Sequence, residues 1–168
     1  MLRARCRAVS IVHAEQLASL EGLEGITAIG NDTLGQSISL NSVPALESLF
    51  GLRNVAGALP GGIQISSAGM LASLGGLEGI TAIRSIYLRS VPALESLSGL
   101  RNVAGALQGS LIIEHADQLA SLDGLEGITA IGKDTNGKSI YLCKLYALES
   151  LSGLRNVAGA LPGSLIID

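Results

Sequence analysis

The chain has 168 residues, of which 48% are hydrophobic and 15% are charged, and its formal net charge is -3. This composition supports one folded domain with a substantial core and excludes a largely disordered chain. The lack of a basic cluster argues against a nucleic-acid surface, and the lack of an apolar run near ~18 residues argues against a membrane span. We therefore expect a soluble single domain over residues 1–168.

The N-terminal stretch "MLRARCRAVSIVHAEQLASL" is basic like a targeting peptide, but its apolar part is shorter than a secretory signal requires. Residues 1–13 are predicted to form a partial first coil of a repeat structure. The chain has two cysteines, Cys6 and Cys143, and several repeats separate them. Because a disulfide needs Cα atoms within ~7 Å, both are predicted to be free thiols.

A repeat follows, anchored on a leucine that recurs in "LASL" or "ALESL". The anchors are Leu17, Leu46, Leu71, Leu94, Leu119 and Leu148. Two intervals are longer because they contain the inserted loops "GNDTLGQ" (residues 30–36) and "GKDTNGK" (residues 132–138), where the middle repeat has only Arg84. Without these insertions the repeats alternate between 23 and 25 residues, which is a length typical of stacked coils.

Each repeat contains a short alternating run, such as "SISL", "GIQI" or "SIYL". Alternation predicts a strand with one face buried. The expected inward residues are Ile38, Leu40, Ile63, Ile65, Ile86, Leu88, Leu111, Ile113, Ile140 and Leu142. Because a return path of roughly twenty residues separates successive strands, they should be parallel, one per coil. The prediction is an all-β parallel solenoid of about six coils with a truncated final strand at residues 164–168.

The remainder of each coil follows the pattern "LxSLxGLxxI", with apolar residues at every third position. That spacing leaves a helix possible. A glycine inside every segment disfavours a helix by about 1 kcal/mol, so we expect short extended pieces joined by bends. The recurring serine, from Ser19 to Ser150, is expected to hydrogen-bond the backbone at a corner, since a catalytic nucleophile is needed only once.

Charges alternate from coil to coil at one position of this segment. The residues are Glu24, Arg53, Glu78, Arg101, Glu126 and Arg155. Stacking at ~4.8 Å would place opposite charges side by side as a structural ladder. Exposed pairs contribute only about 0.2–1 kcal/mol each, so the ladder is expected to fix register rather than to supply most of the stability.

The runs "GSLIIEHADQLASLDGLEGITAIG", "SIYL" and "ALESLSGLRNV" resemble the receptor L-domain family, which includes lobes of insulin-receptor and epidermal-growth-factor-receptor ectodomains and fungal cell-surface proteins. The resemblance covers about residues 9–168. It implies a right-handed, leucine-rich-repeat-like β-helix that binds a ligand outside the cell, although an intracellular setting stays open. Animal lobes carry capping helices and disulfides that this sequence lacks. The chain also ends in mid-strand at "SLIID", so a fragment, a truncated gene product or an end that docks onto something is a further expectation.

One outward column of the predicted strands is the main candidate for partner binding. It contains Ser39, Gln64, Tyr87, Ile112, Tyr141 and Ile166. Parallel stacking would align Tyr87, Ile112, Tyr141 and Ile166 as an exposed apolar stripe about 15 Å long. The alternative is that these residue types simply favour strands.

No pattern in the sequence indicates a catalytic set, a metal site or a cofactor. His13 and His115 lie four coils apart, near ~19 Å, which is too far to share a metal. The inserted loops contain one aspartate each, Asp32 and Asp134, and are expected to be solvated turns, because a calcium loop needs more carboxylates. Asn31 begins a possible N-glycosylation triplet.

We therefore expect a non-catalytic recognition module that binds a protein or a glycan through an exposed sheet face. No nucleic-acid partner is expected. An alternative is a structural spacer whose open ends associate, and a weaker alternative is ice binding, for which the outward column lacks threonine.

Overall fold

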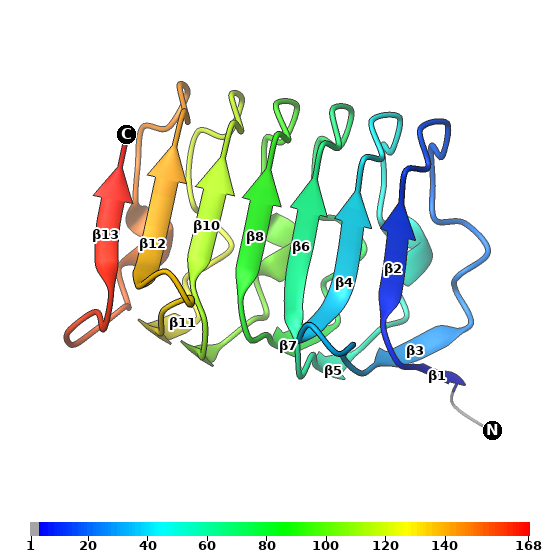
Figure 1. The fold of residues 1–168 in the computed structure, drawn as a ribbon, viewed down its shortest axis with the longest axis horizontal. Coiled ribbons are helices and arrows are strands. Elements are labelled where there is room, and N and C mark those ends of the chain that lie inside the picture. Colours follow the sequence, from blue (N-terminus) through cyan, green and yellow to red (C-terminus); the bar gives the residue numbers. More distant parts are fainter. Residues whose placement is uncertain (1–3) are drawn as a thin grey trace.

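A computed structural model describes residues 4–168 and shows a parallel β-solenoid, which confirms the predicted fold (Figure 1). Seven strands, one from each coil, form the main sheet in the order β13-β12-β10-β8-β6-β4-β2. Their bounds are β2 (Val9–Val12), β4 (Gln36–Asn41), β6 (Gly62–Ser66), β8 (Ile86–Arg89), β10 (Leu111–Glu114), β12 (Lys138–Cys143) and β13 (Ser164–Ile167). Seven strands correspond to six complete turns of the chain.

The winding is right-handed. In Figure 1 the main strands run upward in front, the chain returns behind them, and successive coils advance from right to left. The return path contains three short two-stranded sheets. They pair β1 (Ala4–Cys6) with β3 (Ile26–Ile29), β5 (Gly57–Ala58) with β7 (Ile80–Ala82), and β9 (Gly105–Leu107) with β11 (Ile128–Ile131). Part of the expected first coil, residues 1–3, lies outside the described residues.

The core is a set of vertical columns of aliphatic side chains. Ile63 pairs in register with Ile38 on one side and with Ile86 on the other, and all three side chains are fully buried. The second inward position repeats this with Leu40, Ile65 and Leu88. The predicted inward residues are therefore confirmed, because the two-residue period of a strand directs every other side chain into the solenoid.

The leucine segments form neither α-helices nor extended strands. The N–H of Leu23 donates to the carbonyl of Leu20, and the N–H of Ile26 donates to the carbonyl of Leu23, so consecutive tight turns each span three residues. In alternate coils this path tightens further into short 3-10 helices, η1 (Phe50–Leu52), η2 (Ser98–Leu100) and η3 (Ser152–Leu154). The expectation of extended pieces is therefore wrong in detail. A three-residue hydrogen-bonding period explains why every third residue points inward.

The corner serines behave as predicted. The hydroxyl oxygen of Ser48 accepts the N–H of Phe50 at 3.0 Å, and Ser96 accepts the N–H of Ser98 at 3.1 Å. The equivalent contact occurs in all six segments. These hydroxyls thus serve the backbone where the chain turns.

Glycine is required at the corner by close stacking of the coils and, in alternating coils, also by a positive φ. Gly76 has a φ of +106°, a conformation that side chains rarely adopt. A Cβ atom on Gly76 would also overlap the carbonyl oxygen of Leu49, and Gly99, whose φ is ordinary, lies so close to the coil below that a Cβ atom would overlap the carbonyl oxygen of Leu74. One glycine column therefore combines backbone freedom with close stacking.

A second turn column has positive φ without glycine, and the sequence does not reveal it. Its members are His13, Ser42, Ser67, Ser90, His115 and Lys144, with φ between 51° and 56°. Ser90 shows how the strain is held, because its N–H donates to the carbonyl of Glu114 in the next coil at 2.9 Å. The two histidines thus share a structural position at a turn.

The charge ladder is discontinuous, which corrects the prediction. Arg53 lies 3.3 Å from Glu24, and Arg101 lies 3.9 Å from Glu78. The other three neighbouring pairs of the column, Arg53 with Glu78, Arg101 with Glu126, and Glu126 with Arg155, are beyond ion-pair distance within residues 4–168. Instead, each of the three arginines donates to a carbonyl of its own coil, as Arg155 does to Ser152 at 3.4 Å. An exposed ion pair is too weak to prevent this.

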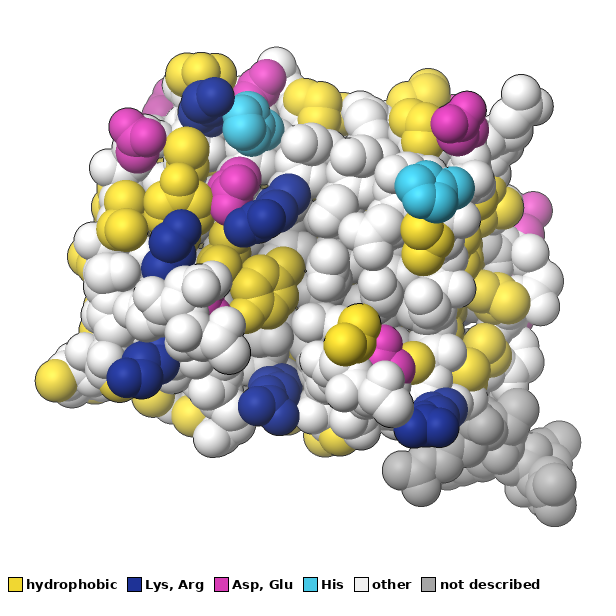
Figure 2. Space-filling view, viewed as in Figure 1, with side chains coloured by type: hydrophobic (Ala, Val, Ile, Leu, Met, Phe, Trp, Pro, Cys, Tyr) yellow, Lys and Arg dark blue, Asp and Glu magenta, His cyan; other side chains and the backbone are white. Residues whose placement is uncertain are grey.

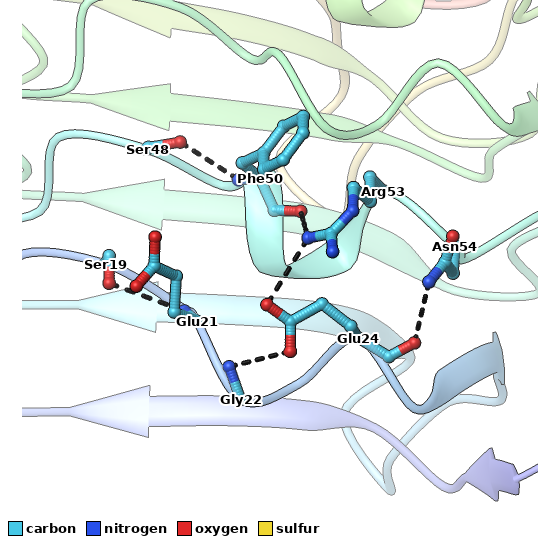
Figure 3. Close-up of polar contacts among 8 residues, drawn as sticks. All are labelled: Ser19, Glu21, Gly22, Glu24, Ser48, Phe50, Arg53 and Asn54. Carbon is cyan, nitrogen blue, oxygen red and sulfur yellow. Dashed lines mark hydrogen bonds and ion pairs between the residues drawn. The ribbon is translucent and has the colours of Figure 1, made fainter.

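Asparagine, rather than arginine, makes the regular contact between these coils. Figure 3 shows the side-chain amide of Asn54 donating to the backbone carbonyl of Glu24, at 2.9 Å. The same contact joins Asn102 to Glu78 and Asn156 to Glu126, each at 2.7 Å. All three coil pairs therefore share this bond, whereas only two share the ion pair.

The glutamates also stabilise the turn that precedes them. Glu24 accepts the N–H of Gly22 at 2.8 Å, as Figure 3 shows, and Glu78 and Glu126 make the equivalent bond. Hydrogen bonding by the N–H of Glu24 itself, followed by those of Gly22 and Arg53, lowers the pKa of Glu24, although burial opposes the shift. This carboxylate therefore stays ionised at neutral pH.

Replacing Gly99 by alanine should destabilise the solenoid by about 2 kcal/mol or more, because the backbone of two coils must separate to admit the methyl group. Gly25→Ala is the matched control, since nothing lies within 4 Å of its Cβ position and its φ is ordinary. Urea unfolding of both variants measures the difference. Equal stability of the two variants would show that the coils do not approach as closely as described.

Asn102→Ala should destabilise the protein by about 1 kcal/mol, because the Glu78 carbonyl loses its side-chain donor. Arg101→Ala should cost less, about 0.5 kcal/mol, because its ion pair is long and exposed. Both are measured by thermal and urea unfolding under the same conditions. A larger loss for Arg101→Ala would restore the charge ladder as the main contact between these coils.

Candidate functional site

The outward column lies on the front face of the main sheet, with its members on neighbouring strands. Tyr87 on β8 is in register with Gln64 on β6 and Ile112 on β10, and Ile112 is in register with Tyr141 on β12. Ser39 and Ile166 extend the column at its two ends. The structure therefore brings together all four residues of the predicted stripe.

The stripe is not a continuous exposed apolar surface, which corrects the sequence expectation. Ile112 is only 2% exposed, whereas Tyr87, Tyr141 and Ile166 are half-buried. Two larger aromatic neighbours flank Ile112 on the adjacent strands, and the second inserted loop lines the same depression as Ile112. Ile112 therefore packs beneath its neighbours and offers almost no contact surface of its own.

The two tyrosines of the column are in different polar environments. The hydroxyl of Ser110 donates to the Tyr87 hydroxyl at 3.0 Å. The ammonium group of Lys138 lies 3.6 Å from the centre of the Tyr141 ring. Hydrogen bonding with the Cys143 side chain raises the pKa of Tyr141, so its phenol is neutral at physiological pH. Of these two tyrosines, Tyr87 is therefore the one whose ring is not covered by a cation from the described residues.

The inserted loops are turns organised by their aspartates, as expected. In the first loop (residues 30–36), one carboxylate oxygen of Asp32 accepts the N–H groups of Leu34 and Gln36, both at 2.8 Å. In the second loop (residues 132–138), Asp134 accepts the N–H groups of Asn136 and Lys138. Near-identical chemistry thus gives the two loops the same shape.

The loops frame a depression that we call the interloop hollow. It comprises two adjoining parts of about 300 and 470 Å³, and residues from both inserted loops line each part. Tyr87 and Gln36 line both parts. The middle repeat has only Arg84 at the position of a loop, so the space between the two loops stays open.

A second outward column lies beside the first, and the sequence analysis missed it. It includes Asn41, Ser66, Arg89, Glu114 and Cys143, each in register with the next. Arg89 and Glu114 form an ion pair at 2.9 Å. The signal was present, because these residues follow the first column by two positions and therefore point the same way. Of them, Ser66 and Arg89 line the interloop hollow.

The two cysteines lie apart from the hollow. Cys6 and Cys143 are free thiols, as predicted. Among residues 4–168 no group of three or more histidine, cysteine or acidic side chains is arranged to hold a metal ion. No helix in that range is long and apolar enough to span a membrane. Asn31 is exposed on the first inserted loop and lines the larger part of the hollow.

Comparisons with protein-family models, with curated proteins and with solved structures found no match for this chain. The solenoid architecture therefore rests on the sequence pattern and the structure themselves.

Proposed function

We propose that the protein is a non-catalytic recognition module that binds its partner on the front face of the main sheet. The observation that carries this proposal is the interloop hollow. The stack of coils is otherwise even, and the two inserted loops form the walls of the hollow on this face. Binding sites for ligands are typically concave and contain a few polar groups that point toward the ligand. The hollow lies across the outward column that the sequence singled out.

The regularity of the scaffold supports this role. Strands β6, β8 and β10 run in unbroken register beneath the hollow, so their outward side chains are fixed relative to one another. A binding site on strands is held more firmly than one on loops alone. On the face shown in Figure 2, Lys and Arg side chains stand apart from one another, with Asp and Glu side chains among them.

The proposed setting follows the resemblance to receptor L-domains rather than any match to a known protein. The leucine and glycine spacing and the coiled parallel sheet are both features of that family. We accordingly propose a cell-surface or secreted location, with Asn31 as a site where a glycan would be attached. Mass spectrometry of protein secreted from a eukaryotic host would detect that modification.

The double substitution of Tyr87→Ser with Tyr141→Ser should leave the fold intact and weaken partner binding at least about tenfold, because each ring contributes contact surface on the front face. The measurement is binding to arrays of immobilised glycans and of purified proteins. Tyr146→Ser is the matched control, since Tyr146 is 77% exposed and lies outside the hollow. Unchanged binding by the double variant would remove this face as the contact surface.

A further inference from the structure

We infer that the interloop hollow binds a short, uncharged oligosaccharide, with Tyr87 at its centre. This inference rests on the proposed function, because it names the class of ligand that the front face takes. It is carried by five features of the hollow: its walls, its polar groups, its balance of charge, its lack of apolar surface and one buried acceptor that has no donor.

The walls of the hollow are the two inserted loops, and the space between them exists because the middle repeat lacks such a loop. Residues 30–36 and 132–138 lead into equivalent strands, β4 and β12, whereas the same place before β8 holds only Arg84. Three strands, β6, β8 and β10, therefore lie between the two loops in the sheet order. The resulting space, about 300 and 470 Å³ in its two parts, is suited to a ligand of a few sugar rings.

The polar groups of the hollow are mainly amides and hydroxyls. The smaller part is lined by Gln36, Gln64, Ser66, Thr135 and Asn136 in addition to Tyr87. An amide side chain presents a donor and an acceptor together, and a hydroxyl can act as either. Sugar hydroxyls have the same dual character, so these groups match a polyhydroxylated ligand. The Tyr87 ring supplies an apolar surface for the C–H groups of one sugar ring.

The charges around the hollow cancel. In the larger part, Asp32 and Asp134 offset Arg84 and Lys133. In the smaller part, the charge of Arg89 is already matched by Glu114 at 2.9 Å. A strongly anionic ligand would therefore meet carboxylates as well as cations, and an uncharged ligand fits this balance better.

The hollow offers little surface to an apolar protein side chain. Of its apolar residues, Ile112 is 2% exposed and Leu34 is 83% exposed on the first inserted loop. Protein interfaces depend on a central cluster of buried apolar or aromatic anchors, and the lining provides only Tyr87 in that role. This distinguishes a sugar from a peptide as the expected occupant.

One acceptor at the hollow has no donor from the protein. The side-chain oxygen of Gln36 is buried without a hydrogen-bond partner among the described residues, and Gln36 lines both parts of the hollow. A buried acceptor that lacks a donor is unfavourable. A ligand hydroxyl reaching Gln36 after a small rotation of its amide would satisfy this oxygen.

The test is titration of the whole chain with defined oligosaccharides by calorimetry, after screening fragments of neutral glucans, mannans, xylans and chitin alongside acidic fragments and a peptide library. The expected result is saturable binding of a neutral fragment. Raising the salt to about 0.5 M should change that affinity by less than about twofold, because no ion pair forms with the ligand.

Two variants locate the binding in the hollow. Tyr87→Ala should weaken affinity about tenfold through loss of the ring contact. Replacing residues 132–138 by a single arginine recreates the sequence "AIRSIYL" that the middle repeat already has, so the strand should still form, and removing this wall should abolish measurable binding. Tyr146→Ala is the control for Tyr87→Ala and should bind like the unaltered chain, while circular dichroism checks that each variant is folded.

The outcomes separate the ligand class from the proposed function. Binding of acidic fragments or peptides alone, lost in Tyr87→Ala, would overturn the inference about sugars and leave the recognition face in place. Neutral-sugar binding that survives in both variants would overturn the hollow as the site. A chain that binds neither sugars, peptides nor proteins through this face would overturn the proposed function as well.

Discussion

The structure depends on the requirement that each coil lie flat on the one below it, within hydrogen-bonding distance along the whole sheet. Parallel strands pair from β2 to β13, and backbone groups of each strand hydrogen-bond to the strand of the next coil. Any group that holds two coils apart therefore breaks many bonds together.

The corners show how the chain meets that requirement. Gly99 has no side chain because a Cβ atom would overlap the carbonyl oxygen of Leu74. Asn102 reaches back to the carbonyl of Glu78, and Ser90 accepts a strained φ of 51° that a hydrogen bond to the next coil maintains. Small local costs are offset by contacts that only the stacked arrangement provides.

Variation is tolerated only where it does not enter the stack, and the candidate site arises there. The two inserted loops leave the coil between the return path and the main strand, so they project from it without changing the spacing of their neighbours. Since the middle repeat lacks the insertion, the two loops stand on either side of an open space. They do not form a continuous ridge. A difference in repeat length thus becomes a hollow with Tyr87 at its centre.

The sequence by itself determined the parallel solenoid, the inward residues such as Ile63 and Leu88, the corner serines and the alignment of Tyr87 with Tyr141, because these follow from periods of two residues and of one coil. It did not determine the path of the leucine segments, since apolar residues at every third position suit several backbones. Burial of Ile112, the breaks in the charge ladder and the interloop hollow were decided by the tertiary structure alone. They depend on how side chains and loops from different coils fill the same space, and no local pattern in the chain encodes that.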